Sequence, residues 1–407
     1  MTTRAQQRRW IAHTVALLAV HFSFMELNAM AAPSASGAVK ASIPIEFSRN
    51  QVRVAVSING STPFRLILDT GMPTRGVMLR HSERIDSLSL DFAQTAHVGG
   101  AGSGGGFATR VAPDERIELG GLELSGVPVI VLPPESKLLQ ETDGVIGAEL
   151  FERFVVRIDV DRKQMDLIDP AAFEPAPGIT AVPLRIRDGM PFLDARVTVQ
   201  DKPVNADLAV DLGAGHGLWL NHGKGDRLAP PAGAIETTLG RGLSGDIHGH
   251  IGRVRRLELG DFTFDGVIAL FPVSEHRNPG GVDFRDGFIG AEVLTRFVFT
   301  FDYRGKRLML ERGGLFAEPF EHDMSGMVLE IHGGEKRRVN SVLAGSPAAE
   351  AGVESGDVLV AIDGIPLAAL GYQGISESLT RDGAVIRVTL ERGGESIEKA
   401  LKLRRLV

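Results

Sequence analysis

Apolar and polar residues alternate over several short stretches of the chain, the pattern expected of strands with one buried face. Gln51–Ile58 and Val155–Val160 have it in the first half of the chain, and Val254–Leu259 and Val298–Asp302 are predicted strands further on. No stretch keeps apolar residues at helical spacing for more than about three turns. The pattern predicts a protein built mainly of β-strands.

The strand pattern occurs twice along the chain. One apolar run leads into Asp69–Gly71, and another leads into Asp211–Gly213, which lies 142 residues later. Further on, the heptapeptide Asp143–Glu149 corresponds to Asp286–Glu292, which lies 143 residues later. A nearly constant offset between two separate motifs indicates a duplication, so we expect two similar lobes.

The two Asp-x-Gly turns are the candidates for chemistry. In each turn an apolar strand delivers a carboxylate, and the glycine lets backbone N–H groups approach it. A twofold relation between the lobes would bring Asp69 and Asp211 together. Two carboxylates that close cannot both ionise, so they share one proton. The ionised member can then take a proton from water while the protonated member polarises a carbonyl group.

The C-terminal segment follows a different pattern. Gly345–Gly352 contains a serine cap and a proline that start a short helix. Gly356–Gly364 is typical of a strand followed by a turn, and Val385–Glu391 with Glu395–Leu403 is typical of a hairpin. We therefore expect a separate small module at the end of the chain.

Together these motifs resemble a known group of proteins. The duplicated Asp-x-Gly turns, with Val145–Gly147 and Phe288–Gly290, resemble the aspartic peptidase clan that includes pepsins and retroviral proteases. The C-terminal segment resembles a PDZ domain of the bacterial type attached to exported proteases. The resemblance implies a mainly β fold: a bilobal pepsin/retropepsin-like β-barrel pseudo-dimer followed by a small α+β PDZ domain. It also implies that Asp69 and Asp211 are the catalytic residues.

The residues around the two aspartates are expected to support them. In this clan a threonine or serine follows each aspartate, and its hydroxyl hydrogen-bonds across the lobe interface. Thr70 fits this pattern, whereas the side chain of Leu212 has no donor or acceptor. We therefore expect Thr70, Gly71, Leu212 and Gly213 to hold the pair with half of the usual hydroxyl network.

The resemblance also implies a flap that closes over the substrate. It falls on the glycine-rich stretch Val98–Gly106, which includes Gly99, Gly100, Gly102 and Gly104. A dinucleotide-binding loop is the other interpretation of such a stretch, but no helical pattern follows it. In the second lobe Leu239–Gly245 stands in the equivalent place.

The PDZ resemblance implies a peptide-binding loop as well. Such domains add a peptide strand beside the strand that follows their carboxylate-binding loop. That loop would consist of Ser325, Gly326, Met327 and Val328, with its N–H groups facing the carboxylate of a protein C-terminus. The alternative is a PDZ fold that only packs on the catalytic body.

The N-terminus has the features of an export signal. Met1–Arg9 carries three arginines, an apolar run extends from Trp10 to Phe24, and Ala29–Ala31 forms an A-x-A cleavage site. We expect cleavage to leave no stable membrane span, which places the protein in the periplasm or outside the cell. The expected domains are a signal peptide at 1–31, lobes at 40–170 and 179–312, and a PDZ domain at 320–405.

The composition of the chain excludes some classes of partner and of chemistry. The net charge of −7 argues against a nucleic-acid partner, which needs a basic face. The chain has no cysteine, so it has neither disulfides nor a thiol nucleophile. His248 and His250 alternate on one predicted face, but solvated loop histidines are the favoured interpretation. We expect no metal and no cofactor.

The sequence leaves two functions open. The first is an exported aspartic endopeptidase that acts on peptides or unfolded proteins. The second is a scaffold with a weakened pair of aspartates that binds peptides through its cleft and its PDZ domain. The intact Asp69 and Asp211 favour the enzyme, while Leu212 and the absence of a tyrosine in the flap favour the scaffold.

Overall fold

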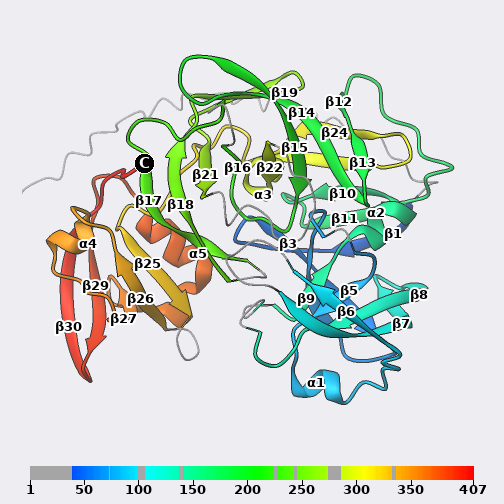
Figure 1. Cartoon of the computed structure of the whole chain (residues 1–407), viewed down its shortest axis with the longest axis horizontal. Coiled ribbons are helices and arrows are strands. Elements are labelled where there is room, and N and C mark those ends of the chain that lie inside the picture. Colours follow the sequence, from blue (N-terminus) through cyan, green and yellow to red (C-terminus); the bar gives the residue numbers. More distant parts are fainter. Residues whose placement is uncertain are drawn as a thin grey trace, which may run out of the picture. The chain divides into compact units, whose positions relative to one another are not determined.

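The structure is a computed structural model that describes residues 39–72, 74–99, 106–136, 139, 142–222, 227–242, 245–273, 286–331 and 336–407. The expected signal peptide lies outside these residues. Within them the chain is mainly β, as predicted, and forms two lobes and a C-terminal module (Figure 1). No helix in this part of the chain is long and apolar enough to cross a membrane.

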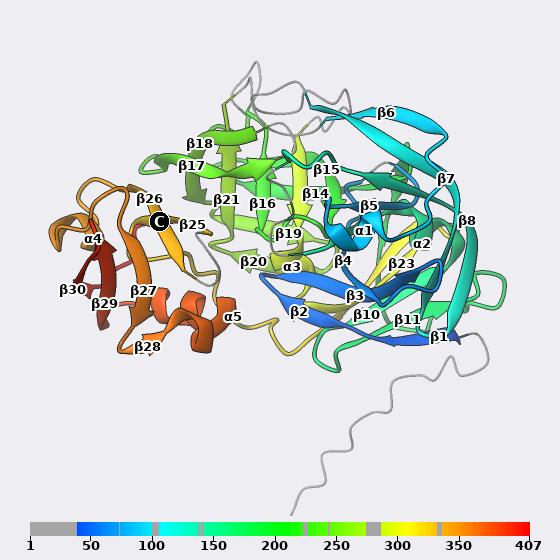
Figure 2. The same ribbon diagram turned by 90° about the horizontal axis from the view of Figure 1, so that it is seen from below.

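The first lobe is built on an eight-stranded sheet. Its strands run in the spatial order β2 (Glu46–Ser48), β3 (Gln51–Ile58), β4 (Phe64–Leu68), β9 (Gly144–Ile146), β5 (Val77–Leu79), β8 (Leu122–Val131), β7 (Phe107–Leu119) and β6 (Gln94–Val98). Two short helices accompany it, α1 (Glu83–Asp86) and α2 (Ala148–Arg153). Figure 2 shows the curved β6–β7–β8 part of this sheet at the edge of the lobe.

The second lobe is built on a larger sheet. Its order is β17 (Ile235–Gly242), β18 (Gly245–Arg253), β21 (Ile268–Pro272), β16 (Leu218–Leu220), β22 (Gly287–Gly290), β15 (Pro203–Asp211), β14 (Met190–Thr198), β19 (Arg256–Leu259) and β20 (Phe262–Asp265). Strand β13 (Arg185–Arg187) pairs with β14, and α3 (Ala291–Leu294) follows β22.

Both lobes contain the same arrangement of strands at their centre. In the first lobe, β9 lies between β4, its parallel partner, and β5, its antiparallel partner. In the second lobe, β22 lies between β15 and β16 with the same directions. Strands β5 and β16 each add one further parallel neighbour, β8 and β21. The duplication predicted from the sequence is therefore present in the fold.

A third sheet joins the two lobes. Its order is β1 (Val39–Pro44), β11 (Gln164–Ile168), β10 (Val155–Asp159), β23 (Phe297–Asp302), β24 (Arg307–Arg312) and β12 (Thr180–Pro183). At its centre Arg157 pairs with Thr300, which lies 143 residues later, and Val156 pairs with Phe301 while Ile158 pairs with Phe299. Arg157 thus opposes its own repeat equivalent, while Val156 and Ile158 each oppose the equivalent of the other. This is the register that a local twofold axis requires. Burial of Phe299 and Phe301 stabilises this junction by roughly 1.5–3 kcal/mol each.

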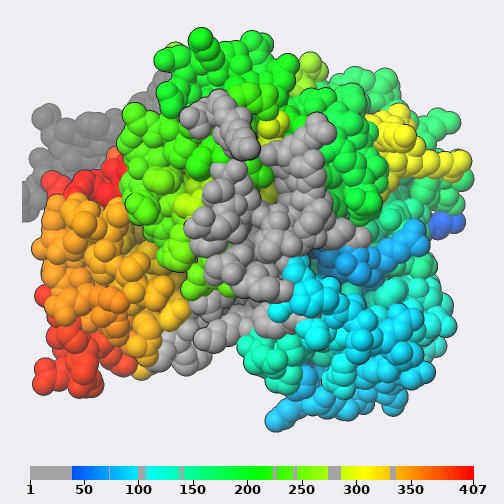
Figure 3. Space-filling model, in the orientation of Figure 1, coloured from blue at the N-terminus to red at the C-terminus, as the bar shows by residue number. Residues whose placement is uncertain are grey.

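The C-terminal module has a separate sheet and its own apolar core. The sheet runs in the order β25 (Met327–Ile331), β26 (Arg337–Val342), β27 (Val358–Ile362), β29 (Val385–Arg392) and β30 (Glu395–Lys402), with β28 (Ile365–Pro366) on β27. Its helices are α4 (Pro347–Glu350) and α5 (Leu367–Leu379). Figure 3 shows the surface of this module in orange and red.

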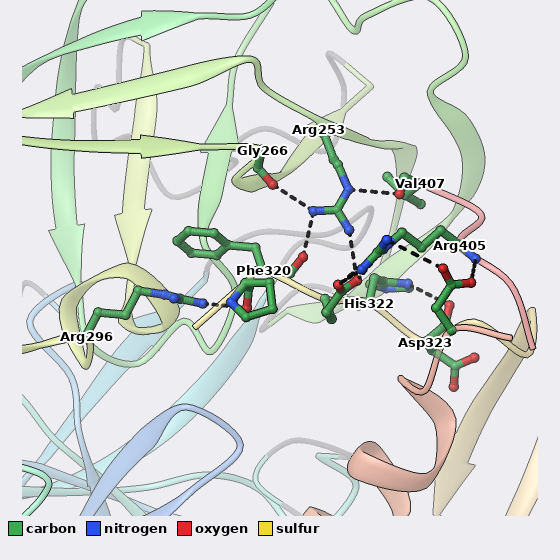
Figure 4. Close-up of polar contacts among 11 residues, drawn as sticks. Arg253, Gly266, Arg296, Phe320, His322, Asp323, Arg405 and Val407 are labelled. Atoms are coloured by element: carbon green, nitrogen blue, oxygen red, sulfur yellow. Dashed lines mark hydrogen bonds and ion pairs between the residues drawn. The ribbon is translucent and has the colours of Figure 1, made fainter. Parts of the chain in front are cut away.

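Two arginines of the second lobe hold the segment that leads into the module (Figure 4). Arg296 donates to the backbone carbonyls of Leu315, Glu318 and Pro319, and its guanidinium lies 3.5 Å from the ring centroid of Phe320. Its neighbour Arg253 donates to three further backbone carbonyls, those of Gly266 at 2.8 Å, Phe320 at 2.6 Å and Val407 at 2.9 Å. The linker and the end of the chain are therefore tied to the same lobe.

This use of Arg296 breaks the symmetry of the repeat. In the first lobe Arg153 forms an ion pair with Glu149, four residues earlier. In the second lobe Arg296 lies four residues after Glu292, but its N–H groups donate to backbone carbonyls of the linker. Burial raises the pKa of Glu292 from 4.5 to about 7, although Arg296 and Arg253 act in the opposite direction.

Glu292 therefore predicts a pH dependence of stability. Because the folded protein holds this proton more tightly than the unfolded chain, stability should fall as pH rises between about 4.5 and about 7. Glu292→Gln should remove this loss. Between pH 5 and pH 8 the free energy of unfolding should therefore fall by up to about 3 kcal/mol less in the variant than in the wild type. Urea unfolding at both pH values measures it, with Glu149→Gln as the matched control. Identical pH slopes in wild type and Glu292→Gln would contradict the assignment.

Candidate active site

Strand geometry delivers one aspartate from each lobe. Asp69 directly follows β4, and its N–H donates to the carbonyl of Ile146 on β9 at 2.9 Å. Asp211 is the last residue of β15 and pairs with Gly290 on β22. Each aspartate is therefore fixed to the apolar-apolar-Gly strand of its own lobe, at equivalent places in the repeat.

The structure brings the two carboxyl groups into hydrogen-bond contact with each other. The N–H of Gly71 donates to Asp69 Oδ1 at 2.9 Å, and the N–H of Gly213 donates to Asp211 Oδ1 at 2.8 Å. The N–H of Ala214 adds a longer contact to Asp211 at 3.2 Å. The turns thus supply backbone donors to both carboxyl groups, as the Asp-x-Gly pattern predicts.

The pKa values of both carboxyl groups are raised, but not by the same set of causes. Burial raises the pKa of Asp69 well above its ordinary value, and the charge of Asp211 and their hydrogen bond act in the same direction. Burial also raises the pKa of Asp211, but hydrogen bonds from Gly213 and Asp69 oppose that shift. Both carboxyl groups therefore hold a proton more tightly than a free aspartate does, and the pull toward the protonated form is stronger at Asp69.

The glycines of the two turns have a role that sequence reasoning missed. A Cβ atom on Gly71 would lie 2.5 Å from Cγ of Asp211, and a Cβ atom on Gly213 would lie 2.5 Å from Cγ of Asp69. Each glycine therefore makes room for the carboxyl group of the opposite lobe. The sequence predicts only that the glycine exposes N–H groups to its own aspartate.

Thr70 connects the two turns across the lobe interface. Its buried hydroxyl donates to the carbonyl of Val210 at 2.7 Å and accepts from the N–H of Leu212 at 3.0 Å. One side chain therefore fixes the backbone on both sides of Asp211. The side chain of Leu212 is fully buried in the main apolar core.

Two polar side chains of the first lobe also hold the second turn. Asn50 donates to the carbonyl of Gly215 at 3.0 Å, and Gln51 donates to the carbonyl of Gly213 at 2.5 Å. Asn50 lies in the turn between β2 and β3, where Arg49 and Asn50 have positive φ angles of 58° and 57°, and Gln51 is the first residue of β3. Nothing in the sequence indicates this contact, because it spans more than 160 residues of chain.

His216 lies close to the second turn as a neutral side chain. Burial lowers its pKa to about 4. Its ring lies 5.2 Å from the ring of Phe288 and 6.0 Å from that of Trp219. Its ring is therefore uncharged near neutral pH and packs with those of Phe288 and Trp219.

The predicted flap is only partly described. Val98 pairs with Phe107 in the hairpin of β6 and β7, and Gly99 follows β6. Gly100, Gly102 and Gly104 lie outside the described residues. In the second lobe β17 and β18 form a hairpin at the equivalent place in the repeat.

His248 and His250 lie on strand β18, with His248 exposed and His250 half-buried. The described part of the chain contains no group of three histidine or acidic residues that could hold a metal ion. The absence of a metal site stays a prediction.

The predicted peptide-binding loop occupies the start of the C-terminal sheet. Ser325 and Gly326 precede β25, and Met327 and Val328 are its first two residues. Ser325 is fully buried. The N–H groups of Ser325 and Gly326 donate to the carboxyl group of Asp323, and that of Met327 donates to the hydroxyl of Ser325.

The duplicated lobes, the paired aspartates and the C-terminal sheet define an aspartyl-protease-like protein with an added binding module. Residues 54–150 match the family model described as aspartyl protease, and residues 338–392 match the model of the PDZ domain. The resemblance carried by the sequence is confirmed for these segments. The chain therefore contains an aspartyl protease lobe and a PDZ domain.

Comparison with curated proteins gives no match. Among solved structures, the chain is similar to the aspartic proteinase from Irpex lacteus. That likeness has 14% sequence identity and a TM-score of 0.44, and it covers 68% of this chain and 98% of the other.

Thr70 gives the sharpest test of the contact between the turns. Thr70→Val keeps the shape but leaves the buried carbonyl of Val210 and the N–H of Leu212 unpaired. We expect a loss of about 2–4 kcal/mol in the free energy of unfolding, since each unpaired buried group costs about 1–3 kcal/mol. Thr70→Ser keeps the hydroxyl and should lose clearly less. Equal losses for the two variants in urea unfolding would show that the hydroxyl does not support the turns.

Proposed function

We propose that this chain is an aspartic endopeptidase that hydrolyses peptide bonds in peptides or unfolded proteins. The observation that carries the proposal is the pair Asp69 and Asp211, whose carboxyl groups are in contact, partly buried and supplied with backbone donors. A buried pair that shares one proton provides an acid and a base at the same place. Aspartic proteases are the standard example of such a pair.

The proposed reaction uses the two protonation states in one step. Ionised Asp211 removes a proton from a water molecule, and the water oxygen forms a bond to the carbonyl carbon of the substrate. Protonated Asp69 donates its proton to the carbonyl oxygen, which gives a neutral tetrahedral intermediate. The proton held by Asp211 then passes to the departing amide nitrogen as the C–N bond breaks. Loss of the hydroxyl proton to Asp69 restores the starting state.

The peptidase fold with a weakened pair remains the second candidate. Leu212 favours it, because the second lobe lacks the hydroxyl that the first lobe supplies. Thr70 weighs against it, because this one hydroxyl already bonds to the backbone on both sides of Asp211. Support for Asp211 is therefore retained, and we favour the enzyme.

Export is a further part of the proposal. It rests on the arginines of residues 1–9, the apolar run that follows them and the A-x-A motif at Ala29–Ala31. The mature protein would then act in the periplasm or outside the cell. The N-terminal sequence of protein recovered from that compartment tests the cleavage site.

Substitution of the two aspartates tests the chemistry. Asp69→Asn and Asp211→Asn should each reduce casein cleavage by at least about 10²–10⁴-fold without unfolding the protein, since each removes one proton carrier. Asp201→Asn, on an exposed side chain, is the control. Wild-type activity should persist above the ordinary aspartate pKa of about 3.9, because Asp69 retains its proton there. Activity that survives either substitution would contradict the mechanism.

The proposal also predicts a competent monomer. A retroviral protease needs two chains because each supplies one aspartate, whereas here one chain supplies both. Activity per molecule should therefore stay constant on dilution, as measured by initial rates over a wide range of enzyme concentration. A steep fall that follows a monomer–dimer equilibrium would contradict it.

A further inference from the structure

The PDZ sheet ends in a strand with an unused edge. Strand β25 pairs with β26 on one side, and no strand among the described residues pairs with its other side. Next to it, the N–H of Met324 donates to the carbonyl of Leu379 at the end of α5, at 2.8 Å. An open strand edge can accept an extended peptide through main-chain hydrogen bonds.

The N–H groups at the start of this strand already have a carboxylate partner. Asp323 Oδ1 accepts from the N–H of Ser325 at 2.7 Å and from the N–H of Gly326 at 3.3 Å. The hydroxyl of Ser325 also donates to this oxygen. The N–H of Met327 donates to Ser325 Oγ at 3.1 Å. These are three of the four N–H groups, all but that of Val328, that the sequence predicts to face the terminal carboxylate of a ligand.

The loop is also held from its opposite face, so these N–H groups have a fixed direction. The carbonyl of Ser325 accepts from Ala348 at 2.9 Å, and the carbonyl of Gly326 accepts from Leu343 at 2.8 Å. Gly326 has a φ of +78°, and a Cβ atom there would lie 2.2 Å from Cβ of Ser346. The loop therefore has little freedom to turn its donors toward a different acceptor.

We infer that this PDZ domain binds internal segments of extended polypeptides rather than free C-termini. The inference rests on the peptide binding proposed above and names its ligand. A terminal carboxylate would have to displace the carboxyl group of Asp323 from the loop donors. An internal segment brings no charge to this point and still gains the hydrogen bonds of the β25 edge.

The nearby cations do not restore a carboxylate site. Arg405 pairs with Glu321 and Asp382, and Arg381 pairs with Asp363. Each of these two arginines is therefore already paired with a carboxylate. Binding of internal segments also suits a peptidase that acts on unfolded chains, because such a substrate can be bound anywhere along its length.

The test compares two forms of one probe. Fluorescein-labelled decapeptides with apolar residues at alternate positions are prepared as free acids and as carboxamides. Their binding to the full-length Asp69→Asn protein, which should not cleave them, is measured by anisotropy. Hydrogen exchange of residues 327–331 reports whether the peptide lies on β25. We expect protection of β25 and equal affinities within about twofold.

Variants of the loop give the complementary result. Asp323→Ala frees the donors of Ser325 and Gly326, so the free acid should then bind at least about tenfold more tightly than the carboxamide. Glu395→Ala, on the opposite edge strand, should leave the ratio unchanged. If the free acid binds the protein with the unaltered loop more than about fivefold more tightly than the carboxamide does, the inference is overturned. Absence of any hydrogen-exchange protection on β25 also overturns the inference. A wild-type protein that does not cleave casein counts against the proposed function alone.

Discussion

The contact between two carboxyl groups from different lobes is the constraint on which this structure depends. Asp69 and Asp211 are partly buried and share a hydrogen bond, so their mutual repulsion must be relieved by a shared proton and by backbone donors. The space for this contact comes from Gly71 and Gly213, each of which faces the aspartate of the other lobe. Such reciprocity requires a twofold relation, and the pairing of Arg157 with Thr300 in the joining sheet has that relation.

The two halves have diverged where symmetry is not needed for this contact. Thr70 keeps its hydroxyl, while its counterpart Leu212 has become part of the apolar core. Arg153 pairs with Glu149 inside its own lobe, while Arg296 binds the linker to the PDZ domain and leaves Glu292 with a raised pKa. The second lobe has thus taken on the attachment of the C-terminal module in place of an internal ion pair.

The sequence was sufficient for the features that repeat or alternate. Gln51–Ile58 was predicted to be a strand and forms β3 with the same bounds, and the repeated motifs indicated where the lobes correspond. Strand β19 begins two residues later than the predicted strand Val254–Leu259, because element ends depend on pairing partners. Within helix α5, Gly371 has a φ of 61°, a kink that helical spacing does not encode.

The features that escaped prediction are contacts between distant parts of the chain. Asn50 and Gln51 reach the turn of the other lobe, and no local pattern marks a polar side chain that donates to a distant carbonyl. Asp323 escaped for a different reason. Resemblance to PDZ domains indicated where a carboxylate-binding loop lies, but not that a neighbouring side chain fills it.

The state of the aspartate pair can be measured without knowledge of the substrate. A carboxyl ¹³C NMR titration of the whole protein, assigned with variants that lack one aspartate, follows Asp69 and Asp211 directly. The account predicts two linked transitions, between which the pair keeps one proton, with the upper one well above the ordinary aspartate value. Two independent transitions near the ordinary value of about 3.9 would contradict it.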